Sequence, residues 1–133
     1  MKKEIIHIPH VPAARGNYSP AVAWGDLLFV SGQLPVDPES GLLIEGSLAA
    51  QVQRAMLNLQ AVLLSAGSDW EHVLKTTVYI TDIAAWGEVN RIYGTFFPQN
   101  PPARTIVPVH ELHYGALIEI DAIAVRKDNV SAE

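Results

Sequence analysis

Residues 47–66 have the sequence SLAAQVQRAMLNLQAVLLSA, in which apolar side chains recur at the spacing of an α-helix. The stripe they form consists of Leu48, Val52, Ala55, Met56, Leu59, Val62 and Leu63. Ser47 is a favoured N-cap residue, and Gly67 is typical of the position just after a helix. Because such a stripe must be buried against another layer, this helix is expected to cover a sheet formed by the flanking segments.

Short segments with strand composition lie on both sides of this helix. They cover about residues 5–8, 21–24, 27–31, 73–80, 103–107 and 117–126. A second helix is expected over about residues 83–97, capped by Thr81 or Asp82 and stopped by the prolines that follow. This order predicts an α+β domain with a mixed sheet and two helices on one of its faces.

Two helices can cover only one face of such a sheet, yet the strands are rich in apolar residues. The apolar strand residues that prompt this concern include Leu28, Val30, Val78, Ile118, Ile120 and Ala122. Within residues 73–80, strand alternation is expected to put Leu74, Thr76, Val78 and Ile80 on one face. A large exposed apolar face indicates a partner, so self-association is expected.

Composition limits the classes of function. The 133 residues suit one domain, expected over 1–133, and 49% of them are hydrophobic. The absence of cysteine excludes disulfides and thiolate chemistry. No signal-peptide run and no stretch of about 20 apolar residues is present, so a cytoplasmic protein without a membrane partner is expected. A net charge of −5 argues against a nucleic-acid partner.

Arg104 is the first candidate for a functional side chain. It lies just inside an apolar strand, in the segment PPART at residues 101–105. A buried guanidinium needs an anion, and its planar fork can hold a carboxylate with two hydrogen bonds. The alternative is a structural salt bridge to Glu119 or Asp121 on a neighbouring strand.

Glu119 is the second candidate, within the strand segment LIEIDA at residues 117–122. Alternation places Glu119 and Asp121 on one face and the intervening apolar residues on the other. A half-buried carboxylate there could orient a water molecule as a general base. The alternatives are a solvated outer face or a partner for Arg104.

Two glycine-containing segments could line a small-molecule site. Tyr18, in GNYSP at residues 16–20, offers an aromatic wall with one hydroxyl, or else ordinary loop packing. Ser31 and Gly32 end a strand, where glycine permits close approach of a ligand or simply a turn. The histidines in HELH at residues 110–113 do not match a zinc-protease motif, and they are interpreted as loop or surface residues.

Taken in order, these segments resemble the YjgF/RidA family, also called the endoribonuclease L-PSP family. The matching segments are Gly16-Asn17-Tyr18-Ser19-Pro20-Ala21, Ser31-Gly32-Gln33, Asp82 to Asn90 with Tyr93 and Phe97, Pro102-Ala103-Arg104, and Ile118-Glu119-Ile120. The resemblance implies a chorismate-mutase-like fold assembled as a homotrimeric barrel, with clefts between subunits. It also implies hydrolytic deamination of 2-enamine or 2-imine carboxylic acids to 2-keto acids and ammonia, with no metal or cofactor.

The resemblance also implies residue roles. Arg104 matches the arginine that binds the substrate carboxylate, and Glu119 matches the acid that positions the attacking water. Tyr18 is assigned with them as a catalytic residue, and the substrate-binding set is completed by Ser31, Gly32, Asn90 and Thr105. Thr105 stands where many members have cysteine, which leaves substrate preference open. Two rival functions remain: an endoribonuclease acting on single-stranded RNA, and a non-catalytic module that binds a small carboxylate.

Overall fold

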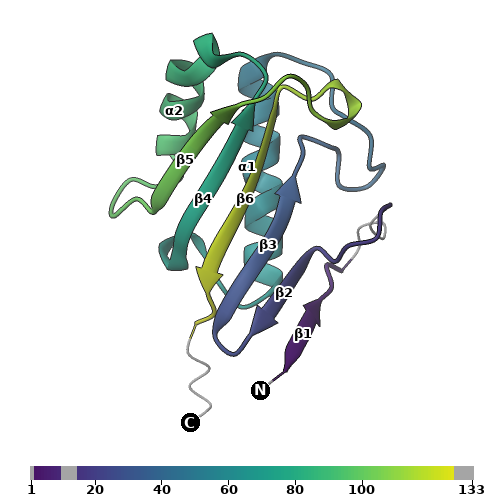
Figure 1. Cartoon of the computed structure of the whole chain (residues 1–133), viewed down its shortest axis with the longest axis vertical. Helices are drawn as coiled ribbons and strands as arrows, with labels where there is room; N and C mark the ends of the chain where they lie inside the picture. The colour runs from purple at the N-terminus through teal and green to yellow at the C-terminus, as the bar shows by residue number, and fades with distance from the viewer. Residues whose placement is uncertain (1, 10–14, 128–133) are drawn as a thin grey trace.

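The computed structural model describes residues 2–9 and 15–127, whose strands form one mixed sheet (Figure 1). The strands are β1 (Lys3–Ile6), β2 (Ala21–Trp24), β3 (Leu27–Gln33), β4 (Val73–Ile80), β5 (Ala103–Pro108) and β6 (Ile118–Val125). They are arranged in the order β1-β2-β3-β6-β4-β5. All neighbours are antiparallel except β4 and β5, which are parallel. The mixed sheet expected from the sequence is therefore confirmed.

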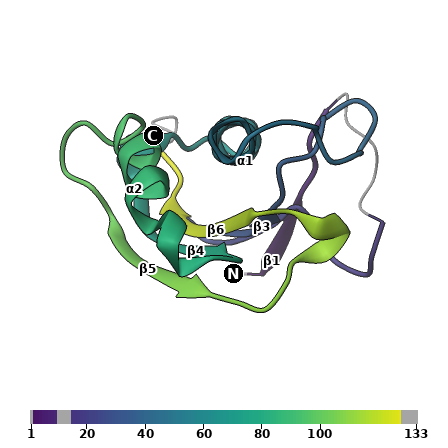
Figure 2. The same cartoon turned by 90° about the horizontal axis from the view of Figure 1, so that it is seen from above.

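Both α-helices, α1 (Leu48–Ser65) and α2 (Trp86–Gly94), lie on the same face of the curved sheet (Figure 2). The Ser47 hydroxyl accepts a hydrogen bond from the Ala50 amide at 3.2 Å, which confirms its role as the N-cap. Three short 3-10 turns connect the elements: η1 (Trp70–His72), η2 (Ile83–Ala85) and η3 (His113–Gly115). The arrangement is the α+β architecture that the sequence predicts.

The second helix is shorter than the predicted 83–97. Asp82 caps the separate turn η2 by accepting a hydrogen bond from the Ala84 amide at 2.9 Å. At the other end, the amides of Phe96 and Phe97 bond to carbonyls only three residues back, at 3.0 and 3.2 Å. Such bonds tighten the chain into a 3-10 turn, so α2 ends at Gly94.

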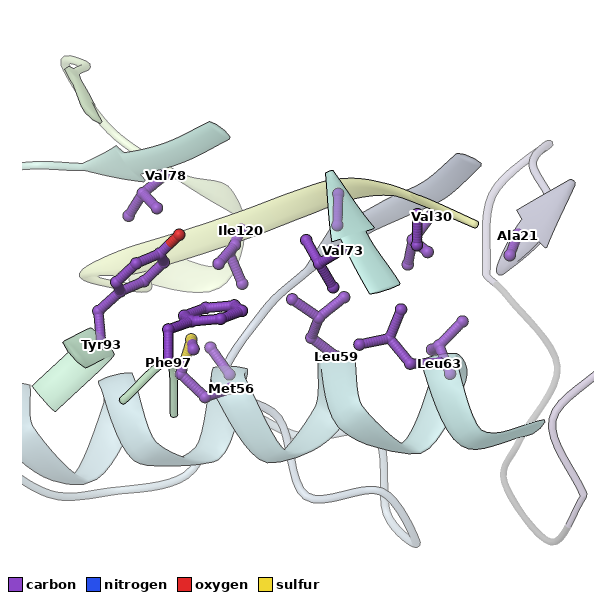
Figure 3. Close-up of a cluster of buried hydrophobic side chains, with 14 of the residues drawn as sticks. Ala21, Val30, Met56, Leu59, Leu63, Val73, Val78, Tyr93, Phe97 and Ile120 are labelled. Atoms are coloured by element: carbon purple, nitrogen blue, oxygen red, sulfur yellow. The ribbon is translucent and has the colours of Figure 1, made fainter. Parts of the chain in front are cut away.

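The apolar stripe of α1 forms the centre of the core. Val52, Ala55, Met56, Leu59 and Leu63 are completely buried. Figure 3 shows Leu59 and Leu63 directed at the sheet, toward Val73 and Val30. This packing makes the helix-covered side of the sheet its inner face and the opposite side its outer face.

Part of the sheet does expose an apolar face, but the prediction of which residues form it was wrong. Leu28, Val30, Val78, Ile118, Ile120 and Ala122 are all buried on the inner face. The outer face instead carries Ile5, Trp24, Leu27 and Phe29, which are 40–49% exposed and lie on three adjacent strands. The error arises because alternation alone does not say which of the two faces the helices cover.

Leu74 is a second correction, because it does not share a face with Thr76, Val78 and Ile80. The pairing between β4 and β6 shifts between Val73 and Lys75, so one extra residue stands out of register there. Leu74 is consequently 49% exposed, while Val73 points into the core.

Within the part of the chain that the structure describes, no helix is long and apolar enough to cross a bilayer.

Replacing Leu59 by alanine should lower the free energy of unfolding by about 3 kcal/mol, because it leaves a cavity beneath the sheet. Chemical denaturation at one fixed protein concentration measures this change. Leu64→Ala on the same helix is the matched control, since Leu64 is 58% exposed. It should change the stability by less than about 0.5 kcal/mol. Equal effects of the two substitutions would contradict the assignment of the core.

Candidate functional site

Arg104 lies on β5, and its side chain faces α2 on the inner side of the sheet. Its Nη1 donates a hydrogen bond to Asn90 Oδ1 at 2.9 Å. The guanidinium carbon lies 4.8 Å from the centroid of the Tyr93 ring and 5.4 Å from that of Trp86. Among the residues described, no carboxylate forms an ion pair with Arg104. A fixed cation is therefore presented without an anion of its own.

The alternative of a structural salt bridge to Glu119 or Asp121 is wrong. β4 lies between β5 and β6, so Arg104 is two strand spacings, roughly 10 Å, from the acidic strand. Arg104 pairs with Thr76, which is fully buried on the inner face, whereas Glu119 pairs with Tyr79 on the outer face. The sheet itself separates the guanidinium from both carboxylates.

One face of α2 supplies the surroundings of Arg104. Trp86, Asn90 and Tyr93 are separated by four and three residues, the spacing that aligns side chains along a helix. Asn90 was predicted as a substrate-binding residue, whereas Trp86 and Tyr93 lay in the matching segments without an assigned role. Tyr93 also belongs to the core, because it is 4% exposed and its hydroxyl forms a 2.7 Å hydrogen bond with Thr76 Oγ1. We call these three residues and Arg104 the Arg104 cluster.

Thr105 follows Arg104 on β5, and its exposed side chain faces away from the Arg104 cluster. It pairs with Thr77, whose neighbours Thr76 and Val78 are the buried, inward residues of β4. The Thr105 hydroxyl therefore lies on the outer face, and only its backbone adjoins Arg104.

Glu119 lies on the outer face of β6, in the vicinity of Gly32. A side chain at Gly32 would collide with the Glu119 carboxylate, so only glycine leaves room for it. Burial raises the pKa of Glu119, repulsion from Asp121 raises it further, and attraction to His113 lowers it. A carboxylate with a raised pKa in a cleft is well suited to accept a proton.

The loop at residues 16–20 is fastened to β3 beside Glu119. Ser31 Oγ donates a 2.6 Å hydrogen bond to the Ser19 carbonyl, and the Ser31 amide donates to the Pro20 carbonyl at 3.0 Å. The hydroxyl proton of Ser31 is thus committed to the loop. Tyr18 extends from this loop and is 59% exposed. We call Tyr18, Ser31, Gly32 and Glu119 the Glu119 cluster.

A groove of about 340 Å³ adjoins the Glu119 cluster. Tyr18 and Gly32 line it, together with His113 and Tyr114 of η3 and residues from one side of α1. Figure 2 shows α2 at one side of the sheet and the yellow-green segment before β6 at the other. A single chain therefore does not bring the Arg104 cluster and the Glu119 cluster together.

The two histidines of residues 110–113, which were interpreted as loop or surface residues, have different surroundings. The His110 side chain is 96% exposed. His113 is exposed but lines the groove, a position that the sequence did not reveal because its spacing matches no known motif.

Comparison with known proteins places the chain in a family. A profile of the family described as Endoribonuclease L-PSP matches residues 8–126. The chain belongs to this family, also called YjgF/RidA. The rat protein named 2-iminobutanoate/2-iminopropanoate deaminase is 44% identical over 124 residues, covering 93% of this chain and 90% of its own length.

Solved structures of other YjgF/RidA proteins have the same fold. The crystal structure of E. coli TdcF with bound serine superposes with a TM-score of 0.86 at 34% identity, covering 93% of this chain and 99% of that one. RidA from an Antarctic Psychrobacter species gives the same TM-score and identity, with 92% and 98% coverage. The expected fold is therefore confirmed at the level of the family.

Substituting alanine at Gly32 should displace the Glu119 carboxylate toward water, and the pKa of Glu119 should then fall toward its ordinary value. Carboxyl chemical shifts followed against pH by NMR measure this change. Gly87→Ala is the control, because a Cβ at that position meets no atom within 4 Å. An unchanged Glu119 pKa in a folded Gly32→Ala protein would show that the two residues are not in contact.

Proposed function

We propose that this protein is a cytoplasmic enzyme that hydrolyses 2-imino carboxylic acids, and the enamines from which they form, to 2-keto acids and ammonia. The observation that carries the proposal is the guanidinium of Arg104, held by Asn90 and two aromatic rings without a carboxylate partner among the described residues. A site built in this way is ready to receive the carboxylate of a substrate.

The names of related proteins support this class of substrate. Rat, mouse and human relatives, at 44%, 39% and 39% identity, are named 2-iminobutanoate/2-iminopropanoate deaminase. TdcF was crystallised with serine, an amino acid that carries the same carboxylate group. The smallest members of the proposed class are the enamine 2-aminoacrylate and the imine that forms from it, 2-iminopropanoate.

The chemistry requires more positioning than activation, because the imine carbon is already electrophilic. Arg104 grips the carboxylate with its fork, while Asn90 fixes the orientation of the guanidinium. Glu119 takes a proton from a water molecule, whose oxygen adds to the imine carbon. The carbinolamine that results loses ammonia and leaves the 2-keto acid. Tyr18 and Gly32 form the walls beside the reacting carbon.

The two clusters are proposed to meet across a subunit interface of a homotrimer. Each chain would contribute its Arg104 cluster to one cleft and its Glu119 cluster to the next. The separation of the clusters by the sheet supports this arrangement. The exposed apolar outer face at Trp24, Leu27 and Phe29 supports an assembly that covers it.

Arg104→Ala should lower kcat/KM for an imine by at least about 100-fold, because two charge-assisted hydrogen bonds to the carboxylate are lost. Arg104→Lys should recover less than about a tenth of the wild-type value, since an ammonium lacks the planar fork. The measurement is ammonia release while an amino-acid oxidase or dehydratase generates the imine in the same cuvette.

Arg91→Ala serves as the control for these variants, because Arg91 is an exposed residue of α2 that follows Asn90 directly. Its kcat/KM should match that of the wild type. Undiminished turnover in a folded Arg104→Ala protein would exclude the proposed role of the guanidinium.

Mixing inactive variants tests whether the clefts are shared. When Arg104→Ala and Glu119→Gln chains are unfolded together and refolded at equal amounts, most trimers contain both. Each mixed trimer then has one cleft with both residues intact, so about a quarter of the wild-type activity should return. If Arg104 and Glu119 served one cleft from the same chain, no activity would return.

Endoribonuclease activity is a second candidate, because the matching family profile carries that description. The net charge of −5 gives little attraction for a polyanion. Cleavage of single-stranded RNA by the same purified assembly, lost in Arg104→Ala, would favour this function. Ligand binding without turnover of fresh imine would instead identify a small-carboxylate binding module.

A further inference from the structure

The proposed hydrolysis needs a proton donor as well as a base. The residues assigned so far include a base, Glu119, but no separate proton donor. The imine nitrogen must gain two protons before it departs as ammonia. Arg104 is already assigned to the substrate carboxylate. Glu119 has the opposite task of taking a proton from water. A second group that exchanges protons near neutral pH would divide this work, and histidine is the side chain suited to it.

His113 lines the groove that adjoins the Glu119 cluster. Gly32 lines the same groove, and the Glu119 carboxylate lies against that glycine. The positive charge of the imidazolium favours ionisation of Glu119 and so lowers its pKa. His113 and Glu119 therefore belong to one cleft, although the interpretation of the sequence left this histidine at the surface.

The backbone of η3 holds the imidazole in place. The His113 ring packs on the Tyr114 ring with a centroid separation of 3.8 Å and an interplanar angle of 39°. Tyr114 has a φ of 63°, an uncommon conformation for a residue with a side chain. Hydrogen bonds from Gly115 to Leu112 at 3.1 Å and from Ala116 to His113 at 3.2 Å close the turn. Strained backbone that is held this firmly is often associated with function.

We propose that His113 is the general acid of the reaction and delivers a proton to the imine nitrogen. The assignment rests on the proposed hydrolysis and adds a catalytic residue to it. His113 gives its proton to the nitrogen while the water oxygen bonds to carbon and Glu119 takes a proton from that water. The nitrogen of the carbinolamine then takes the second proton from Glu119.

Breakdown of the carbinolamine restores both groups. The C–N bond breaks and its electron pair leaves with ammonia. The hydroxyl proton of the carbinol passes to His113, and the 2-keto acid remains. One imine and one water thus yield one keto acid and one ammonia, with Glu119 again ionised and His113 again protonated. No other reactant is required.

Other titratable groups face this pair from the neighbouring elements. Asp121 lies on the same strand as Glu119, and its carboxylate accepts a 3.3 Å hydrogen bond from Tyr79 of β4. Around the groove stand Arg15, Tyr18, Asp37 and Tyr114. Of these groups, Asp121 raises the pKa of Glu119, while His113 is the one that lowers it.

The test compares the pH dependence of kcat/KM in the wild type, in His113→Asn and in His110→Asn. His113→Asn should lower the maximal kcat/KM by about 100-fold and lose the fall in rate at alkaline pH that marks a general acid. Its acidic limb should move to higher pH, because the pKa of Glu119 rises when the nearby positive charge is removed. His110→Asn, in the same loop but outside the lining of the groove, should behave like the wild type.

NMR titration of the Glu119 carboxyl provides a readout that does not depend on activity, and its pKa should be higher in His113→Asn. Wild-type rates and an unshifted pH profile in His113→Asn would overturn the role of His113 and leave the proposed hydrolysis intact. A wild-type protein that does not accelerate loss of the imine would overturn both. An unchanged Glu119 pKa in His113→Asn would show that the two side chains do not interact, and it would also overturn the role of His113.

Discussion

Burial of the α1 stripe against the sheet determines what every other residue of the structure can do. Met56, Leu59 and Leu63 are removed from water only if one particular face of β3 and β6 lies beneath them. Once that face is chosen, alternation places each strand residue either under a helix or on the far side. Arg104 and Glu119 are both strand residues, so their opposite orientations are a direct result of this packing.

For the proposed hydrolysis, separation of the two charges within one chain has a chemical advantage. An arginine next to a glutamate of its own chain would form an ion pair, and a substrate carboxylate would have to compete with it. With the sheet between them, the guanidinium stays available and the carboxylate keeps a raised pKa. Aromatic rings and an amide stabilise the cation without neutralising it. Each half of the site is thus prepared independently of the other.

Local patterns were sufficient to predict α1, the strand segments that become β2 and β3, and the alternation of Glu119 with its apolar neighbours. They were not sufficient for Leu74, whose position depends on a register shift between two strands, or for the end of α2, which depends on backbone bonds after Tyr93. Arg104, Tyr18 and Gly32 were candidates from their own residue types and positions, and the family resemblance added their roles and Asn90. Trp86 was also within reach, since it stands four residues before Asn90 on a predicted helix. His113 was not, because its place in the same groove as Gly32 of β3 arises only in the folded chain.

The hydrogen bond between Tyr93 and Thr76 makes one residue of the Arg104 cluster necessary for the stability of the fold. The Thr76 hydroxyl is fully buried, and Tyr93 is its partner. Phenylalanine in place of Tyr93 would keep a ring over Arg104. It would, however, leave the Thr76 hydroxyl buried without a hydrogen-bond partner. Related chains without the proposed activity should therefore still be selected to retain Tyr93. Retention of Tyr93 among related chains therefore reflects a requirement of folding. Evidence that an activity is retained has to come from residues that the fold does not require.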